Sequence, residues 1–236
     1  MSARVQRALV VRPDAGRVTA SDATSPRHVA SRILLVVLGT ALSSYGYLLT
    51  AAAGVGNGPL FAVQEGLVAR TGLSTGTASM VLAAVIVALA VALRAPLGVG
   101  TLVIPVVAGL WIDALEPLTL SFDPLWARWA AFVAGTVVMM LGAVVSVTAA
   151  LGASAMDGVM LSLARRTGRT PAGARIVMEV VMAGLGFAIG GRIGLGTVAM
   201  GLSVGPLFGF WSRQLGRYGL EVPSSASARH APEVAG

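Results

Sequence analysis

Residues 33–53 read ILLVVLGTALSSYGYLLTAAA, and residues 129–151 read WAAFVAGTVVMMLGAVVSVTAAL. Both stretches are free of charge, and each is long enough to cross a hydrocarbon core of about 30 Å as a helix, which takes roughly 20 apolar residues. Aligned from Arg32 and Arg128, they carry Gly-Thr at the same place and a second Gly at the same place further on. These stretches predict membrane helices in a duplicated chain.

The composition extends this prediction to the whole chain. Hydrophobic residues make up 56% and charged residues 11%, the mean hydropathy is +0.82, and a soluble domain would carry about 25% charged residues. Four further stretches with little or no charge are 74–93, 99–112, 172–189 and 193–211. The stretch 99–112 is short and contains Pro105, which removes one backbone donor from a helix. We therefore expect an all-α polytopic membrane protein with six spans.

All 17 basic residues are Arg, and the net charge is +7. The arginines lie in the tails and between apolar runs, which is typical of positive-inside topology and not of a nucleic-acid-binding face. Residues 1–31 contain no apolar core of a signal peptide and are predicted to be a disordered cytoplasmic tail. Residues 213–236 are predicted to form a second cytoplasmic tail. The expected location is a bacterial plasma membrane, with the lipid bilayer as the main partner.

An internal repeat fixes the expected organisation. At an offset of 96 residues, the difference between Arg32 and Arg128, the chain matches itself without a gap. Arg70-Thr71-Gly72 meets Arg166-Thr167-Gly168, and both copies contain a GxGT turn. The prediction is a first membrane repeat over 32–115 and a second over 128–212. Residues 116–127 join them as an extracytoplasmic loop.

Each repeat contains a short segment, 59–70 in the first and 156–166 in the second. At 1.5 Å per residue neither segment can cross the bilayer core alone. Each is expected to be a re-entrant or interfacial helix. With three spans in each repeat, the second copy is inverted relative to the first. If the short segments did cross, the copies would be parallel, and the positive-inside rule does not separate the two topologies. We prefer the inverted arrangement on segment length.

Charges within membrane-embedded sequence mark the candidate site, since each costs at least about 2.5 kcal/mol near the bilayer centre. Asp157 lies in the first turn of its short segment, where it suits either a helix dipole or a cation or proton site. Arg175 and Glu179 are spaced to pair on one helix face. Glu65 faces either headgroups or a cavity. The candidate substrate or ion-binding residues are Asn57, Gln64, Glu65, Asp157, Arg175 and Glu179.

The two copies differ at these polar positions. Asp157 is opposite Phe61 in the repeat, and Glu179 is opposite Ala83. We therefore expect any working site to belong mainly to the second repeat.

The glycines are interpreted as structural. The GxGT turns lack the strand and the GK[ST] sequence of a phosphate loop, so they are expected to be tight turns between closely packed spans. The turn glycines are Gly98, Gly100, Gly194 and Gly196. A further stripe is expected to pack inside the bundle, with homo-oligomer formation as the alternative. It consists of Gly201, Gly205 and Gly209.

An enzyme is not expected. The two histidines, His28 and His230, lie in the predicted tails, and no nucleophile or zinc-binding motif is present. We expect no cofactor and no resident metal.

The second repeat resembles a known family. Residues 152–168 read GASAMDGVMLSLARRTG and are similar to the GxxxxDGxMxxLSxRTG segment of YczE/YyaS-type bacterial membrane proteins, relatives of the YitT group. The resemblance covers roughly residues 32–215. In the first repeat the family pattern usually has Asp where Phe61 stands and a His-like position where Gln64 stands, which speaks against a symmetric pair of sites. The resemblance implies a duplicated membrane fold with a transporter-like role.

Two functions follow from these features. The first is a small-molecule or ion transporter with a site near the repeat interface, because of the repeat, the short segments and the sparse intramembrane carboxylates. The alternative is a non-transporting membrane scaffold or accessory protein, since each charge also has a plausible structural partner.

Overall fold

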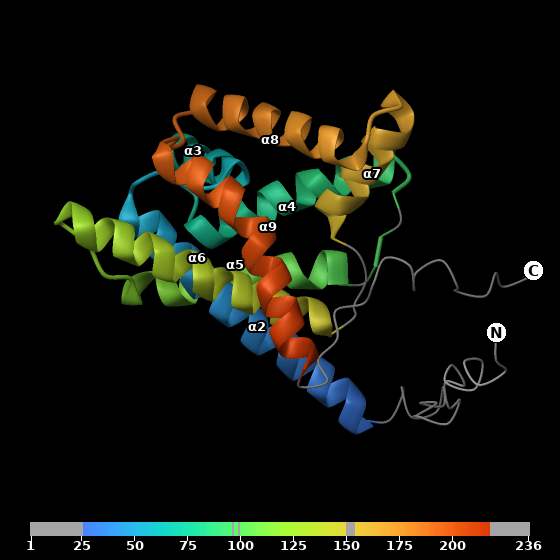
Figure 1. Ribbon diagram of the computed structural model, residues 1–236, viewed down its shortest axis with the longest axis horizontal. Helices are drawn as coiled ribbons and strands as arrows, with labels where there is room; N and C mark the ends of the chain where they lie inside the picture. The colour runs from blue at the N-terminus through green and yellow to red at the C-terminus, as the bar shows by residue number, and fades with distance from the viewer. Residues whose placement is uncertain (1–25, 96, 99, 150–153, 218–236) are drawn as a thin grey trace, which may run out of the picture.

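The computed structural model describes residues 26–95, 97–98, 100–149 and 154–217, with side chains from Ala30 onward. These residues form helices joined by short turns (Figure 1). The helices are α2 (Pro26–Ala53), α3 (Pro59–Thr71), α4 (Thr75–Ala92), α5 (Gly100–Leu115), the 3₁₀-helix η1 (Glu116–Leu118), α6 (Leu125–Thr148), α7 (Ala155–Thr167), α8 (Pro171–Ala188) and α9 (Leu195–Gly216). Of the predicted tails, residues 1–25 and 218–236 lie outside the described residues. The predicted disorder is wrong from Pro26 onward, where α2 begins, and the predicted C-terminal tail starts inside α9, which continues to Gly216.

Six of the described helices, α2, α4, α5, α6, α8 and α9, are long and apolar enough to cross a membrane. This confirms the expected multi-pass helical class and six candidate spans. The predicted boundaries were less accurate at α6. The helix begins at Leu125, directly after Pro124, and the described helix ends at Thr148, before the predicted 151. Pro105 lies inside α5, which still continues to Leu115.

The two short segments form separate helices of 13 residues each, α3 and α7. Each is about 20 Å long at 1.5 Å per residue, which is less than the hydrocarbon core. Both end at the glycine of the Arg-Thr-Gly sequence, because Gly72 has φ 70° and Gly168 has φ 65°. Only glycine adopts this left-handed conformation without steric cost, so it stops the helix there.

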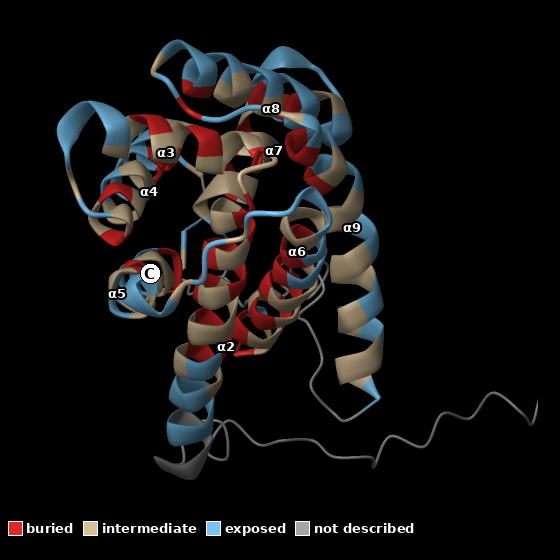
Figure 2. Cartoon of the chain, turned by 90° about the vertical axis from the view of Figure 1, so that its left-hand side faces the viewer, coloured by how far each residue is buried: buried red, intermediate tan, exposed pale blue. Residues whose placement is uncertain are grey.

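The centre of the bundle is the contact between α2 and α6, where buried residues line both helices (Figure 2). The helices are antiparallel, because Arg128 at the start of α6 donates to the Ala53 carbonyl at the end of α2 at 2.7 Å. Glycines allow the two backbones to meet, and a Cβ added at any of them would collide with the facing helix. The pairs in contact are Gly39 with Gly142 and Gly46 with Gly135.

The short helices pack against spans that are distant in sequence, α3 on α8 and α7 on α4. The arginine of each Arg-Thr-Gly sequence reaches the last carbonyls of that span. Arg70 Nε donates to the Ile189 carbonyl at 3.2 Å, and an Arg166 Nη donates to the Leu93 carbonyl at 3.2 Å. Carbonyls at a helix C-terminus lack partners within the helix, so a cation there is favourable.

The last spans of the two halves pack differently. In the first half, Asp113 on α5 accepts hydrogen bonds from the Ser74 hydroxyl at 2.8 Å and the Gly76 amide at 2.6 Å, which joins α5 to the start of α4. In the second half, α9 packs against α6. No atom lies within 4 Å of where a Cβ of Gly205 would stand. The expected packing of the glycine stripe inside the bundle is therefore wrong at Gly205.

The GxGT sequences lie at the starts of α5 and α9. Thr101 Oγ1 accepts from the Gly98 amide at 3.1 Å, and Thr197 Oγ1 accepts from the Gly194 amide at 3.2 Å. The Gly196 amide also donates to the Val55 carbonyl at 2.9 Å. The threonine thus caps the first turn of each helix, and the neighbouring glycine lets the backbone of residues 55–56 approach.

Candidate functional site

A polar cavity of about 400 Å³ opens where the end of α2 meets α3, the start of α4, η1 and the turn between α8 and α9. Its apolar wall includes Leu48, Ala51 and Val68. The polar residues that line it are Tyr47, Glu65, Thr75, Glu116, Thr119 and Arg192. Cavities of this volume match the usual size of small-molecule sites.

Glu65 is the most enclosed charge of the polar cavity. Its side chain is 16% exposed, whereas that of its partner Arg192 is 68% exposed. The Glu65 Oε2 atom lies 3.8 Å from Arg192 Nε and accepts a hydrogen bond from the Arg192 amide at 3.2 Å. Burial raises the pKa of the Glu65 carboxyl, and the contacts with Arg192 oppose this shift. A carboxylate at this position can exchange a proton or hold a cation.

Two hydroxyls of the polar cavity are buried and have no hydrogen-bond partner among the described residues. They belong to Tyr47, whose residue exposure is 2%, and to Thr119. The Tyr47 ring packs against Phe61 with a centroid distance of 4.6 Å, so the ring is held in place. Because buried polar groups in folded proteins are nearly always paired, these hydroxyls indicate a place for a water molecule or a ligand.

Glu116 completes the charged lining. It lies on the exposed 3₁₀-helix, and its Oε1 atom accepts a hydrogen bond from the Thr75 hydroxyl at 2.7 Å. No cation lies within 4 Å of its carboxylate in the described part of the chain. Glu65, Glu116 and Arg192 together therefore give the polar cavity an excess of negative charge.

Two predicted site residues, Gln64 and Asn57, do not line the polar cavity. Their hydrogen bonds hold in place the helices and the turn that form it. Gln64 Nε2 donates to the Thr75 carbonyl at 3.0 Å, which ties α3 to the start of α4. Asn57 Oδ1 accepts from the Gly58 amide at 3.0 Å, which orders the turn before α3. The Asn57 side chain also lies close enough to Glu65 to lower the pKa of that carboxyl.

The other three predicted residues form a separate cluster, the Arg175 triad of Asp157, Arg175 and Glu179. Arg175 Nε pairs with Glu179 Oε1 at 2.9 Å, as their spacing predicted, and Arg175 Nη1 lies 3.8 Å from Asp157 Oδ1. All three side chains are partly exposed, at 51%, 47% and 35% in chain order. Burial raises the pKa of Asp157, and Arg175 lowers it. One arginine thus contacts both carboxylates.

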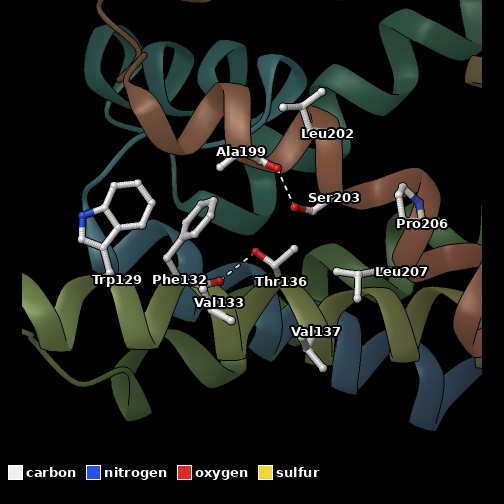
Figure 3. A pocket seen from close by; sticks show the side chains of 10 residues that line it. All are labelled: Trp129, Phe132, Val133, Thr136, Val137, Ala199, Leu202, Ser203, Pro206 and Leu207. Carbon is white, nitrogen blue, oxygen red and sulfur yellow. Dashed lines mark hydrogen bonds between the residues drawn. The ribbon is translucent and has the colours of Figure 1, made fainter.

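A second cavity, of about 410 Å³, lies between α6 and α9 and is almost entirely apolar (Figure 3). Its two hydroxyls are already used. Thr136 donates to the Phe132 carbonyl and Ser203 to the Ala199 carbonyl, each at 2.7 Å. Apart from the indole N–H of Trp129, the apolar cavity therefore offers no free polar side chain with which to recognise a ligand, and the polar cavity is the better candidate site.

The polar cavity contains few of the site residues that the sequence predicted. Of the predicted residues, Glu65 alone lines the polar cavity, and the Arg175 triad lines neither cavity described here. Sequence reasoning missed Tyr47, Glu116, Thr119 and Arg192. A signal existed for Tyr47, because a tyrosine in the middle of an apolar span requires a partner for its hydroxyl.

Within the described residues no three His, Cys, Asp or Glu side chains are grouped to hold a metal ion.

Comparison with known proteins gives the family. A family of unknown function, DUF6198, matches residues 30–213. An uncharacterized protein of Haemophilus influenzae is 25% identical over 185 residues, which cover 78% of this chain and 85% of that protein. The uncharacterized membrane protein YczE of Bacillus subtilis is 28% identical over 179 residues, which cover 75% and 80%. No solved structure matches. The resemblance to YczE-type membrane proteins is confirmed, and this multi-pass helical protein belongs to the DUF6198 family.

Proposed function

We propose that the protein is a small-molecule transporter, and that the polar cavity around Glu65 and Arg192 is its binding site. The observation that carries this proposal is the combination of a mostly buried carboxylate and a buried hydroxyl without a partner at one cavity. The cavity is large enough for a small molecule, Glu65 is mostly buried, and the buried Tyr47 hydroxyl has no partner in the described residues. A purely structural contact would have paired these groups within the protein.

The position of the polar cavity also supports transport. Most of its lining comes from residues 47–75 and 116–119, while Gly190 and Arg192 come from the turn between α8 and α9. A relative movement of the two halves of the chain would therefore change the cavity directly. Binding sites at the junction of two repeats are common in secondary transporters.

We further propose that the two halves are inverted copies. In a two-fold arrangement with an offset of 96 residues, position 39 corresponds to 135 and position 46 to 142. The observed contacts join Gly39 to Gly142 and Gly46 to Gly135. The two-fold rotation that exchanges the halves therefore converts each of these contacts into the other. The antiparallel course of α2 and α6 is the direction that inverted copies require.

The arginine contacts of the short helices follow the same rule. Arg70 contacts the carbonyl of Ile189, and Arg166 contacts that of Leu93. The repeat offset of 96 residues relates Arg70 to Arg166 and Leu93 to Ile189. The two contacts therefore involve equivalent positions, with the roles of the two halves exchanged. These reciprocal contacts support inverted duplication as the origin of the fold.

The orientation is proposed from the arginines of the tails. With both termini in the cytoplasm of a bacterial cell, the end of α2 and the start of α6 lie on the outer side of the plasma membrane. The polar cavity then faces outward and the Arg175 triad lies toward the cytoplasm. We propose a binding and transport role for the protein, without enzymatic chemistry.

A flux measurement tests the transporter proposal. Purified protein is reconstituted into liposomes, and charge movement is recorded on a solid-supported membrane after addition of butylammonium, sodium, potassium, alanine or glucose. Uptake of a labelled form of each probe covers electroneutral transport. We expect protein-dependent flux of at least one probe, and its loss in Glu65→Gln. Equal signals from protein-containing and empty liposomes for every probe would contradict the proposal.

A further inference from the structure

The charges of the polar cavity determine the sign of the ligand. Two carboxylates, Glu65 and Glu116, and one arginine, Arg192, line the cavity. The neighbouring guanidinium of Arg128 is engaged with the Ala53 and Gly54 carbonyls, where it offsets the negative end of α2. Arg192 is already engaged with Glu65 through both its guanidinium and its amide. Glu116 has only the Thr75 hydroxyl as its partner among the described residues. One negative charge is thus left over, and it favours a monovalent cation.

The size and the wall of the polar cavity exclude a bare ion as the best fit. A volume of about 400 Å³ is more than ten times the roughly 30 Å³ that one water molecule occupies in the liquid. One side is formed by Leu48, Ala51, Ala52 and Val68, which offer methyl and methylene groups only. A ligand that fills the space therefore combines a cationic head with a small apolar body.

The unused hydroxyls indicate the kind of cationic head. A hydroxyl oxygen accepts hydrogen bonds, and a primary ammonium group donates three. The polar cavity offers acceptors of both types, the carboxylates of Glu65 and Glu116 and the hydroxyls of Tyr47 and Thr119. A quaternary ammonium has no N–H and would leave the two buried hydroxyls without partners, which is unfavourable.

We propose that the polar cavity binds a small primary alkylammonium ion, with the ammonium group at Glu65, Glu116 and the Tyr47 hydroxyl and the alkyl chain along Leu48 and Ala51. This names the substrate class of the cavity assigned above and so rests on the proposed function.

The nearest competing ligand is a zwitterion such as an amino acid. Its carboxylate would require Arg192 as a partner, and that guanidinium is largely exposed but already lies against Glu65. A zwitterion would also bring no net charge, so the leftover charge of Glu116 would stay uncompensated. The structure therefore favours the alkylammonium ion, and alanine serves as the discriminating probe.

The test is direct binding to the full chain in lipid nanodiscs, measured by isothermal titration calorimetry without any flux. Butylammonium is compared with the neutral butanol, with tetramethylammonium, with sodium and with alanine. We expect butylammonium to bind at least about tenfold more tightly than every other probe, because it alone supplies charge, three donors and an alkyl chain.

Four variants locate the binding. Glu65→Gln and Glu116→Gln each remove one charge and are expected to weaken butylammonium binding about tenfold or more. Glu65→Asp retains the charge and is expected to keep part of the affinity. Glu179→Gln, which removes a carboxylate from the Arg175 triad, is expected to leave binding unchanged. Thermal unfolding of each variant identifies any that fails to fold, and Glu65→Asp then carries the test.

The outcomes separate this inference from the transporter proposal. Alanine or tetramethylammonium binding in place of butylammonium would overturn the alkylammonium assignment, while flux of alanine would leave transport intact. Absence of binding by every probe would also overturn it. Butylammonium binding without flux in liposomes would support the cation site and contradict transport. Unchanged butylammonium affinity in folded Glu65→Gln and Glu116→Gln would place the ligand elsewhere and overturn the assignment.

Discussion

The polar cavity and the Arg175 triad contain the same charged groups, two carboxylates and one arginine, yet they are arranged differently. In the triad, Arg175 contacts both Glu179 and Asp157. In the polar cavity, Arg192 contacts Glu65, and Glu116 is left with a hydroxyl partner. Both clusters carry one net negative charge, but the arginine of the triad contacts both carboxylates, whereas the polar cavity leaves Glu116 without a cation within 4 Å and two hydroxyls without a partner among the described residues. The two clusters therefore have the same net charge and differ in how their groups are paired, and this difference is the basis for proposing the polar cavity as the binding site.

The largest expected difference between the two regions is functional. Glu65→Gln is expected to lower butylammonium affinity about tenfold or more, while Glu179→Gln leaves it within about twofold because Glu179 lies outside the cavity. Calorimetry in nanodiscs measures both. Equal losses of butylammonium affinity in the two variants would mean that the polar cavity and the Arg175 triad act as one site.

Removal of the two arginines should lower stability by different amounts. Arg192→Met leaves the mostly buried carboxylate of Glu65 without its guanidinium partner, and we expect about 1–3 kcal/mol of destabilisation. Arg175→Met leaves two partly exposed carboxylates without a cation and should cost less than about 1 kcal/mol. Reversible unfolding in mixed micelles measures the two values.

A compensated variant controls the stability prediction. Combining Arg175→Met with Asp157→Asn and Glu179→Gln removes the unpaired charges and is expected to recover most of the lost stability. A triple variant as unstable as Arg175→Met alone would show that the arginine acts through packing of its side chain and not through charge.

The pH dependence should appear in the polar cavity. Burial raises the pKa of Glu65, and only its ionised form attracts a cation. Butylammonium affinity should therefore be highest above this raised pKa and fall as pH decreases through it. Calorimetry across the acidic range measures the profile. The titration of Glu65 should vanish in Glu65→Gln, and a profile that keeps its shape in that variant would assign the titration to another group.

Tyr47→Phe is expected to have the smallest effect. Loss of the hydroxyl removes one acceptor for the ammonium, and we expect binding to weaken about threefold to tenfold. Stability should change by less than about 1 kcal/mol or increase, because no hydrogen bond within the described protein is lost. A marked loss of stability would show that the hydroxyl has a structural partner and does not await a ligand.

Much of the architecture was predictable, because the signals are local. Runs of apolar residues predicted the six candidate spans now found, and the lengths of 59–70 and 156–166 predicted two short helices. The Arg-Thr-Gly sequences predicted where these helices stop, since glycine ends a helix at positive φ. The spacing of Arg175 and Glu179 predicted their pairing.

The candidate site was predicted only in part. Asp157 and Glu179 drew attention because they lie in apolar sequence, but a charge is conspicuous there whether or not it is paired. Glu116 and Arg192 lie in turns, where charges are ordinary, so neither stood out. Their importance arises because η1 and the turn after α8 meet at α3, a contact between residues more than 100 positions apart in the case of Glu65 and Arg192.

The sequence alone determined that the chain is a helical membrane protein with six candidate spans and matching glycines in two halves, because hydropathy and backbone conformation are properties of neighbouring residues. The tertiary structure alone decided which of those glycines meet, that Gly205 stays open, and that Tyr47, Glu65, Glu116 and Arg192 line one cavity. Enclosure and pairing depend on elements far apart in the chain. They therefore exist only once the antiparallel contact of α2 and α6 has brought the two halves together.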